Sequence, residues 1–395
     1  MNSETLKQAA AAFGTPSYIF DTDIFAGRAA KVKAAFGENV GLCYSIKANP
    51  FLLASMPEEF SYIEVCSPGE LSICEKTGAP LDKIIFSGVN KTYEDVERAY
   101  NDGVAIFTAE SALHLEYINK CVKDHCGKAK VILRLAHGSQ FGIDREELVK
   151  LISERDSLYE GVEMIGIHYF TGTAKKKAKT IAKELETLDE LCKELEADCG
   201  FTASHIEYGT GLAVEYYKDM TEQTDMSLLA EVSEVIKPFA EKYPLTVEMG
   251  RFFAAECGYY LTKAMDIKTN GGTNYVICDG GINQLNYYGQ NMAMNVPPID
   301  VLDKDGGDTD YCLCGSLCTT ADVLVRKVSL PSLDRGDVIC FNRCGAYSVA
   351  EGIAAFLSRA VPNVLSYSEK SGFTLHRLLT ETYPLNTPKI GGNDL

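Results

Sequence analysis

The chain alternates between two kinds of segment over its first 250 residues. Short runs of apolar and β-branched residues recur at 40–48, 62–67, 84–88, 104–109, 130–136, 164–170, 205–211 and 245–250. Stretches with helical spacing and mixed charge, such as 109–122 and 175–197, separate these runs. Apolar strands that alternate with amphipathic helices indicate a parallel sheet covered on both faces. Eight such units predict an α/β fold of the (β/α)8-barrel type, and a doubly wound open sheet is the structural alternative.

The pattern changes after Arg251, where helical spacing becomes scarce. Strand-like segments follow at 259–268, 273–279, 324–327 and 337–341, and one helix-like segment lies at 349–357. We expect a second, mostly antiparallel β domain, with which the strand-like segment 17–21 pairs. The predicted barrel covers residues 22–255, and the predicted β domain covers 1–21 together with 256–395.

Composition and charge narrow the classes of function. The formal net charge of -17 would repel phosphate backbones, which argues against nucleic-acid binding. The sequence contains no run of about 18 apolar residues, so we expect no membrane span. Residues 1–13 lack the pattern of a secretory signal. The 14 cysteines scatter through apolar segments without a C-x-x-C pair, so we expect reduced thiols in a cytoplasmic protein and no metal site.

The ends of the predicted barrel strands carry the candidate chemistry, because barrel active sites lie at the carboxyl ends of the strands. The first run ends in Tyr44-Ser-Ile-Lys47-Ala-Asn-Pro50. A lysine inside an apolar strand loses solvation, which lowers its pKa and makes it a usable nucleophile. A surface lysine that reaches solvent along its aliphatic stem is the alternative interpretation.

Three other strand ends add polar groups. The sixth run carries His168 and Phe170, and the seventh ends in Gly209-Thr210-Gly211, a loop whose N–H groups could hold a phosphate. The eighth ends in Glu248-Met-Gly250-Arg251. An ordinary turn and a salt bridge to a helix are the alternatives for these two ends. Together, an amine, a phosphate cradle with an arginine, a carboxylate and a stacking ring match what pyridoxal phosphate requires.

The motifs resemble those of the ornithine/diaminopimelate/arginine decarboxylases, pyridoxal-phosphate enzymes with an alanine-racemase-like barrel and a β domain. The resemblance runs nearly from end to end and keeps the family's order. The matching segments are 14–18, 44–50, 65–71, 86–91, 139–142, 248–251, 279–283, 315–322 and 345–347.

This resemblance implies specific roles. Lys47 would hold the cofactor as a Schiff base, and Glu248 would contact the pyridine nitrogen. Cys318 would come from a second subunit and help to protonate the substrate carbon after carbon dioxide leaves, which implies a homodimer with shared active sites. The remaining cofactor-binding candidates are His168, Phe170, Gly209, Thr210, Gly211, Gly250, Arg251 and Tyr347.

The chain also departs from the family pattern at the substrate end. Phe170 stands where a stacking histidine is usual, Thr319 stands where an acidic residue follows the cysteine, and Asn286 stands where diaminopimelate enzymes carry an arginine. Asn286, Thr319 and Asp322 are the candidate substrate-binding residues. The missing charges predict a small-molecule amino-acid substrate whose far end is neutral, weakly charged or tethered to a carrier.

Two alternative functions remain beside an α-decarboxylase of a diaminopimelate-like or specialised substrate. An amino-acid racemase on the same barrel would place an arginine at the pyridine nitrogen, and Glu248 argues against it. A non-catalytic pyridoxal-phosphate-binding protein would need neither the β domain nor the Cys318 motif.

Overall fold

The computed structural model describes residues 1–217, 222–290 and 292–389. The described chain divides into two compact units. The barrel unit comprises Ala26–Val214 and Glu222–Phe253, and the β unit comprises Met1–Phe25, a short stretch after residue 214 and the chain from Ala254 onward.

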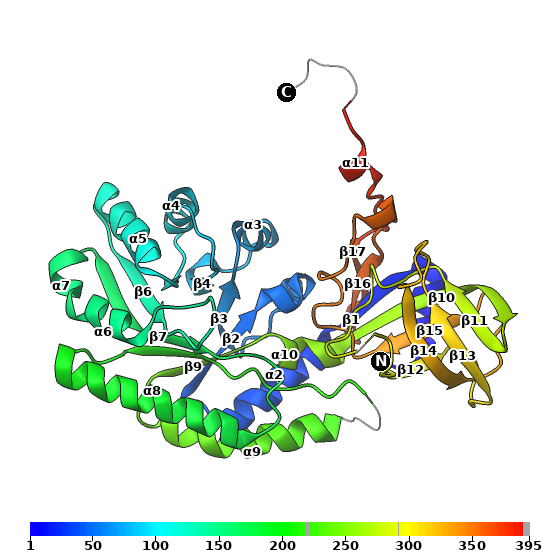
Figure 1. Ribbon diagram of the computed structural model, residues 1–395, viewed down its shortest axis with the longest axis horizontal. Helices are drawn as coiled ribbons and strands as arrows, with labels where there is room; N and C mark the ends of the chain where they lie inside the picture. Colours follow the sequence, from blue (N-terminus) through cyan, green and yellow to red (C-terminus); the bar gives the residue numbers. More distant parts are fainter. Residues whose placement is uncertain (218–221, 291, 390–395) are drawn as a thin grey trace. The chain divides into compact units, whose positions relative to one another are not determined.

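Eight parallel strands close the barrel unit (Figure 1). They are β2 (Val40–Ser45), β3 (Phe60–Val65), β4 (Ile84–Phe86), β5 (Ile106–Ala109), β6 (Ala129–Arg134), β7 (Val162–Phe170), β8 (His205–Gly209) and β9 (Leu245–Met249). The last strand, β9, pairs with β2, so the sheet has no open edge. The predicted (β/α)8 barrel is confirmed, and the open doubly wound sheet is excluded.

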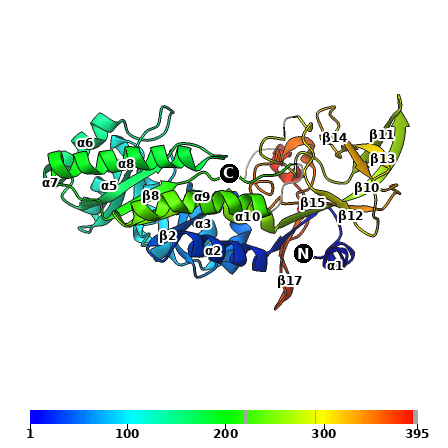
Figure 2. The same cartoon turned by 90° about the horizontal axis from the view of Figure 1, so that it is seen from below.

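Helices cover the outside of the barrel. They are α2 (Thr22–Phe36), α3 (Pro68–Thr77), α4 (Tyr93–Asn101), α5 (Ala112–Asp124), α6 (Arg145–Ser153), α7 (Arg155–Leu158), α8 (Ala178–Cys199), α9 (Glu222–Ala240) and α10 (Arg251–Ala254). Local signals set several of their ends: Thr92 and Asp95 form a capping box at α4, and Gly200 ends α8 in the left-handed region at φ 58°. Figure 2 shows α8 and α9 side by side along the barrel.

Both apolar and polar side chains of the barrel strands are buried. Cys43, Ile85, Ile106 and Ile132, each from a different strand, form a buried apolar cluster. Polar side chains that are also buried come from other strands, among them Glu64, His168, Glu207 and Glu248. Burial of ionisable groups is costly unless they are paired, so these buried polar side chains are where we look for a functional site.

The β unit is a mixed sheet in which most pairs are antiparallel, as predicted. Its strands are β1 (Ser17–Asp21), β10 (Gly258–Asn270), β11 (Thr273–Cys278), β12 (Ile299–Val301), β13 (Thr309–Cys314), β14 (Val323–Leu330), β15 (Val338–Asn342), β16 (Asn363–Ser368) and β17 (Gly372–Arg377). The main order is β14-β13-β11-β10-β1-β16-β17, with β15 on β10 and β12 on β15. The segment 17–21 pairs into this sheet as expected, antiparallel to β10 and parallel to β16.

One predicted element of the β unit is wrong. Residues 349–357 form no α-helix; turns occupy most of this range, and a short 3-10 segment, Phe356–Ser358, follows. Leu357 has φ 56°, which breaks helical geometry. Gly352 approaches the backbone so closely that a Cβ would lie 2.1 Å from the carbonyl oxygen of Asn283. The apolar residues of 349–357 therefore lie in an irregular loop and not on one face of a helix.

Several elements of the β unit escaped the sequence pattern. The strands β12, β13, β16 and β17 are short or polar on one face, and helix α1 (Ser3–Phe13) lies in an alanine-rich segment. Leu6 and Ala9 of α1 pack against the sheet through Ile19, Leu261 and Leu365. In the part of the chain that the structure describes, no helix is long and apolar enough to cross a membrane.

A buried histidine makes the stability of the barrel depend on pH. His205 begins β8, is almost fully buried, and packs edge-on against Tyr62 with ring centroids 5.4 Å apart. Burial, assisted by the charges of His168 and Lys130, lowers the pKa of His205 from 6.5 to about 4. The unfolded chain therefore binds a proton between these pH values that the folded chain does not bind.

We predict that His205→Gln weakens the pH dependence of stability. In the wild type, the contribution of neutral His205 is fully present above pH 6.5 and is lost as the pH falls towards about 4. Between pH 7 and 5 the wild type should lose about 2 kcal/mol more unfolding free energy than the variant. Urea unfolding of both proteins at the two pH values measures this difference, and equal losses would contradict the assignment of a neutral buried imidazole.

Candidate active site

A pocket of about 240 Å³ lies at the carboxyl ends of the barrel strands. This is where barrel folds place their active sites. It is lined by Lys47, Glu64, Cys66, Gly88, Val89, Glu110, Arg134, Phe141, His168, Phe170 and Glu248.

Lys47 lies just beyond β2 rather than inside it. The strand ends at Ser45, and Lys47 follows in the 3-10 segment Ile46–Ala48. The buried Asn49 side chain accepts a hydrogen bond from the Phe51 N–H and so begins the next turn at Pro50. The predicted strand 40–48 is therefore too long, because the backbone leaves the extended conformation after Ser45 and turns into the 3-10 segment that carries Lys47. As a consequence the lysine side chain keeps 37% exposure at the pocket.

The Lys47 ammonium lies among acidic and thiol groups. Its Nζ is 2.8 Å from Glu64 Oε2, 3.5 Å from Glu248 Oε1 and 3.5 Å from Cys66 Sγ. The Cys66 thiol in turn donates to Glu64 Oε1 at 3.2 Å, and burial raises its pKa well above the ordinary value. The thiol therefore stays protonated, and the carboxylates are the basic groups next to the amine.

Glu248 is buried and hydrogen-bonded on both oxygens. Ser45 Oγ donates to Oε1 at 2.7 Å, and His168 Nε2 lies 3.1 Å from Oε2. Burial alone would raise the pKa of this carboxyl, but Lys47 and His168 hold it well below its usual range. The structure therefore maintains a negative charge at this point of the barrel.

A second buried glutamate behaves in the opposite way. Glu207 is fully buried, and neither carboxyl oxygen has a hydrogen-bond partner among the described residues. Burial first, then the charges of Glu248 and Glu64, raise its pKa well above the ordinary value. A neutral Glu207 thus lets the interior hold three carboxyl groups around one lysine.

The Gly209-Thr210-Gly211 loop follows β8 with an unusually tight backbone. A Cβ on Gly211 would lie 2.0 Å from the carbonyl oxygen of Gly172, and a Cβ on Gly209 would lie 2.5 Å from the Phe170 ring. The Thr210 hydroxyl is buried without a hydrogen-bond partner in the described chain. Such an unsatisfied donor beside glycines fits a ligand with acceptor oxygens, as a phosphate has.

Gly250 and Arg251 follow β9. A Cβ on Gly250 would meet Ala48 Cβ at 2.8 Å and the carbonyl oxygen of Ser45 at 3.0 Å. The glycine therefore lets the end of β9 approach the turn that carries Lys47. Arg251 begins α10 directly after it.

The barrel pocket is not lined by Gly209, Thr210, Gly211, Gly250 or Arg251. The other predicted site residues belong to the β unit and do not line this pocket either. Cys318 is exposed, and Tyr347 adopts φ 68° in the loop after β15. Asn286 Nδ2 lies 3.3 Å from Glu351 Oε2, so a carboxylate lies beside this amide. The roles predicted for these residues stay predictions.

Asp322 has a structural task in the β unit. Its carboxylate is buried and accepts the N–H groups of Ile282 at 2.9 Å and Leu317 at 2.6 Å. These bonds fix the loop before Cys318 against the Asp279–Asn283 turn. Substrate binding by Asp322, with both oxygens occupied in this way, stays a prediction.

Several residues that line the pocket are not among the predicted site residues. Glu64 stands in the strand-like segment 62–67, and its charge in an otherwise apolar strand was the available signal. Arg134 and Glu110 form a buried ion pair at 2.5 Å beside the pocket. No local motif could have paired these two, because Arg134 ends β6 and Glu110 follows β5.

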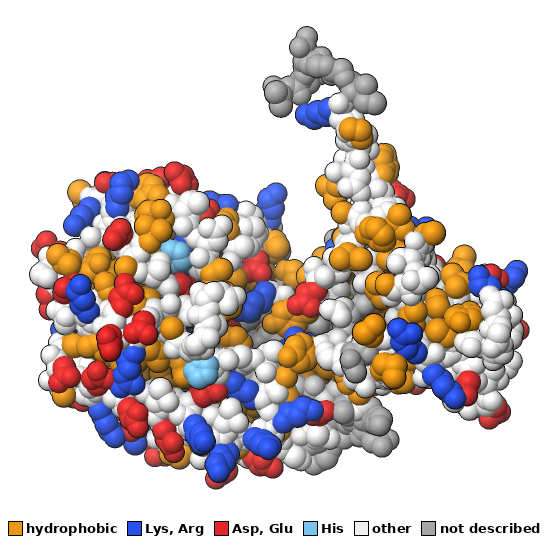
Figure 3. Space-filling view, in the orientation of Figure 1, with side chains coloured by type: hydrophobic (Ala, Val, Ile, Leu, Met, Phe, Trp, Pro, Cys, Tyr) orange, Lys and Arg blue, Asp and Glu red, His pale blue; other side chains and the backbone are white. Residues whose placement is uncertain are grey.

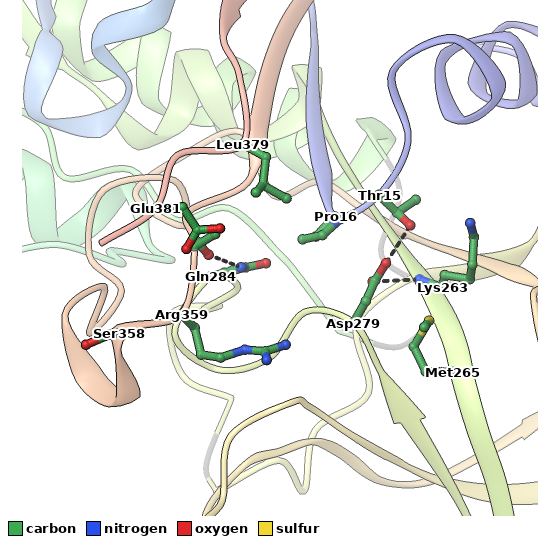
Figure 4. Close-up of a pocket in the computed structure, with 11 residues that line it drawn as sticks. Thr15, Pro16, Lys263, Met265, Asp279, Gln284, Ser358, Arg359, Leu379 and Glu381 are labelled. Atoms are coloured by element: carbon green, nitrogen blue, oxygen red, sulfur yellow. Dashed lines mark hydrogen bonds between the residues drawn. The ribbon is translucent and has the colours of Figure 1, made fainter. Parts of the chain in front are cut away.

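A larger cavity of about 490 Å³ lies in the β unit (Figure 4). Its wall includes Arg359, Glu381, Lys263 and Asp279, and the Asp279 carboxylate accepts from Thr15 Oγ1 and the Lys263 N–H. None of the residues predicted to hold the cofactor lines it. No group of three or more metal-binding side chains occurs among the described residues.

Comparisons with known proteins identify the family of the barrel unit. Residues 23–255 match the family model described as "Pyridoxal-dependent decarboxylase, pyridoxal binding domain". The L-glutamyl-[BtrI acyl-carrier protein] decarboxylase of Niallia circulans is 27% identical over 89% of this chain and 88% of its own length. The diaminopimelate decarboxylase of Aquifex aeolicus is 26% identical, covering 88% of this chain and 85% of its own.

The solved structures agree along the whole fold. The diaminopimelate decarboxylase of M. jannaschii in complex with L-lysine superposes with a TM-score of 0.85 at 25% identity, over 98% of this chain and 94% of its own. The family match covers more than half of the chain, and the relatives are amino-acid decarboxylases. The chain therefore belongs to the pyridoxal-dependent decarboxylases, the enzymes that use pyridoxal phosphate to remove a carboxyl group from an amino acid.

Proposed function

We propose that Lys47 is the residue that holds pyridoxal phosphate and that Glu248 is the carboxylate at its pyridine nitrogen. The observation that carries this assignment is the buried, ionised Glu248, which lies 3.5 Å from the Lys47 amine and is fixed by Ser45 and His168. A negative charge at this place keeps a pyridine nitrogen protonated. The arginine of a racemase site would do the opposite, so this carboxylate favours decarboxylation.

The residues around the pocket fit the remaining parts of the cofactor. The unsatisfied Thr210 hydroxyl and the crowded glycines Gly209 and Gly211 support phosphate binding by this loop, together with Arg251. Phe170 lines the pocket, and its phenyl ring would pack on a face of the pyridine ring. Gly250 and Tyr347 complete the proposed set, Tyr347 from the β unit.

The mechanism follows from these positions. Bound pyridoxal phosphate supplies an electron sink for the breaking bond between the α-carbon and the carboxyl group. Lys47 must lose a proton from Nζ before it can act as a nucleophile, and Glu64 Oε2 at 2.8 Å is the base within reach. His168 and Ser45 hold the Glu248 carboxylate in place while the charge in the site changes. Cys318 then donates a proton to the α-carbon.

The assembly and compartment are part of the proposal. Cys318 is exposed in the isolated chain, which suits a residue that completes the site of a partner subunit in a homodimer. All 14 cysteines are free thiols, which suits an enzyme of the reducing cytoplasm.

The substrate end is the least charged part of the proposed site. Thr319 and Asn286 supply a hydroxyl and an amide, and the Glu351 carboxylate lies 3.3 Å from the Asn286 amide. We propose a substrate with a neutral, weakly charged or carrier-borne far end. A relative that acts on a carrier-bound glutamyl group supports the carrier-borne form.

The first prediction concerns the cofactor lysine. Lys91 is the rival, because it is buried and burial lowers its pKa to about 8, yet it does not line the pocket. Borohydride reduction of the native enzyme followed by peptide mapping should place the cofactor on Lys47. Lys47→Ala and Lys47→Arg should both lose the visible absorbance and turnover. A reduced adduct on Lys91 would overturn the assignment.

The second prediction concerns shared sites. Lys47→Ala and Cys318→Ala subunits should each be inactive alone, and their mixture should regain about a quarter of wild-type sites through heterodimers with one intact site. The matched control mixes Lys47→Ala with Glu248→Gln, which lie in the same barrel and should not complement. The shared site would be contradicted if light scattering shows that the fully active enzyme is a monomer. Equal recovery of activity in the two mixtures would also contradict it.

The third prediction concerns the substrate. Meso-diaminopimelate should be a poor substrate by kcat/KM, because no guanidinium stands at position 286 to bind its distal carboxylate. Thr319→Glu should improve kcat/KM for lysine or ornithine roughly tenfold, since it adds a counter-charge for the far ammonium. Thr320→Glu adds the same charge one residue along and is the control. Efficient turnover of meso-diaminopimelate by the wild type would refute the argument, and Glu351→Gln would then show whether Glu351 reads that end.

A further inference from the structure

The strongest local concentration of positive charge lies in the segment 175–183. It holds five lysines in nine residues and no acidic residue, in a chain whose formal net charge is -17. Its sequence is Lys-Lys-Lys-Ala-Lys-Thr-Ile-Ala-Lys, and Glu184 is the first acidic residue after it.

The segment lies next to the active-site pocket of the barrel unit. It follows β7, whose last residue, Phe170, lines the pocket. The Lys175 N–H donates to the Gly211 carbonyl at 2.9 Å, and the Ala213 N–H donates to the Lys175 carbonyl at 3.0 Å. The lysine segment is therefore tied by its backbone to the loop proposed to hold the cofactor phosphate.

The five lysines divide into one that faces inward and four that face outward. Lys175 is largely buried, and its Nζ lies 2.6 Å from Glu184 Oε2. Lys176, Lys177, Lys179 and Lys183 are exposed, and we call these four the lysine patch. Figure 3 shows Lys and Arg side chains gathered over the part of the barrel unit where α8 begins.

The lysine patch is unfavourable for the helix that carries it. Lys177 is the N-cap of α8 and makes no side-chain capping bond, and cations at a helix N-terminus oppose the helix dipole. Lys179 and Lys183 are four residues apart, a spacing at which like charges cost about 0.2–0.5 kcal/mol. Lys177, Lys179 and Lys183 form no ion pair within residues 1–217, 222–290 and 292–389. Helix stability therefore does not explain the patch.

Position and charge together indicate the kind of partner. A small free amino acid that fills a pocket of about 240 Å³ needs no row of charges on the outer helix. A carrier protein does, because its acidic surface must dock outside while its phosphopantetheine arm delivers the substrate inside. Opposite charges at such a contact steer the encounter and set the register.

We propose that the lysine patch is the docking surface for an acidic acyl-carrier protein that presents a tethered amino-acyl substrate to the pocket. This inference rests on the proposed function, and it names the partner of that same site. The carrier binds over the first turns of α8, and its arm passes the loop between β7 and α8 to reach Lys47.

Charge reversal tests the docking surface directly. The test variant carries Lys177→Glu, Lys179→Glu and Lys183→Glu. The control variant carries Lys123→Glu, Lys128→Glu and Lys150→Glu, three exposed lysines elsewhere on the barrel unit that also lack an ion pair in the described chain. Both variants change the net charge equally, so a difference between them reports the location of the charge.

The probe is the holo form of the BtrI acyl-carrier protein, the carrier of the Niallia circulans relative. The holoenzyme should bind it with a dissociation constant on the order of 10 µM at low salt, and more weakly as salt rises. The test variant should bind at least about tenfold more weakly, and the control variant should stay within about twofold of the wild type. No binding by the wild type, or equal weakening in both variants, would overturn the docking surface.

Turnover separates this inference from the proposed function. Carbon dioxide release from free amino acids should be unchanged in the test variant, because the lysine patch lies outside the pocket. If the enzyme decarboxylates free amino acids but does not bind the carrier, the docking surface is wrong and the proposed function stands. If the enzyme binds the carrier but decarboxylates no free or carrier-borne substrate, the proposed function is wrong and the docking surface stands.

Discussion

The ionised carboxylate of Glu248 inside the barrel is the constraint on which the site depends. Burial disfavours this charge, and it persists because the Lys47 amine, the His168 imidazole and the Ser45 hydroxyl all contact it. Ser45 and Lys47 come from the end of β2 and the turn that follows it, His168 comes from β7 and Glu248 from β9, so the closed barrel brings these groups together. These contacts also require the backbone at Gly250 to lie close to Ser45 and Ala48, which leaves little room for a side chain at position 250.

The neighbouring carboxyls show how the barrel limits the charge that it holds. Glu64 pairs with the Lys47 amine at 2.8 Å, whereas Glu207 lies deeper, without a hydrogen-bond partner in the described chain, and has a raised pKa. A third ionised carboxylate around one lysine would leave an uncompensated buried charge. Neutral Glu207 avoids this cost, and Glu248 keeps its charge.

The sequence was sufficient for those parts of the fold that follow from local pattern. The apolar runs gave all eight barrel strands, and Gly209, Glu248 and Lys47 stood at or just beyond strand ends because parallel strands finish on one face of a barrel. The ion pairs Glu110–Arg134 and Lys47–Glu64 could not be predicted from the sequence. Their partners are distant in the sequence and meet only because the barrel strands pair in a particular register. The helix predicted at 349–357 was wrong because the apolar residues of this range lie in a loop in which Leu357 has a positive φ.

We propose that the negative charge of Glu248, rather than the shape of its side chain, drives the chemistry. The most direct measurement is the kcat of Glu248→Gln with pyridoxal phosphate bound, as verified by its visible absorbance. Glutamine preserves the size of the side chain but removes the charge, so we expect a cofactor-loaded enzyme whose kcat falls on the order of 10²–10³-fold. A loaded variant that keeps wild-type kcat would contradict it.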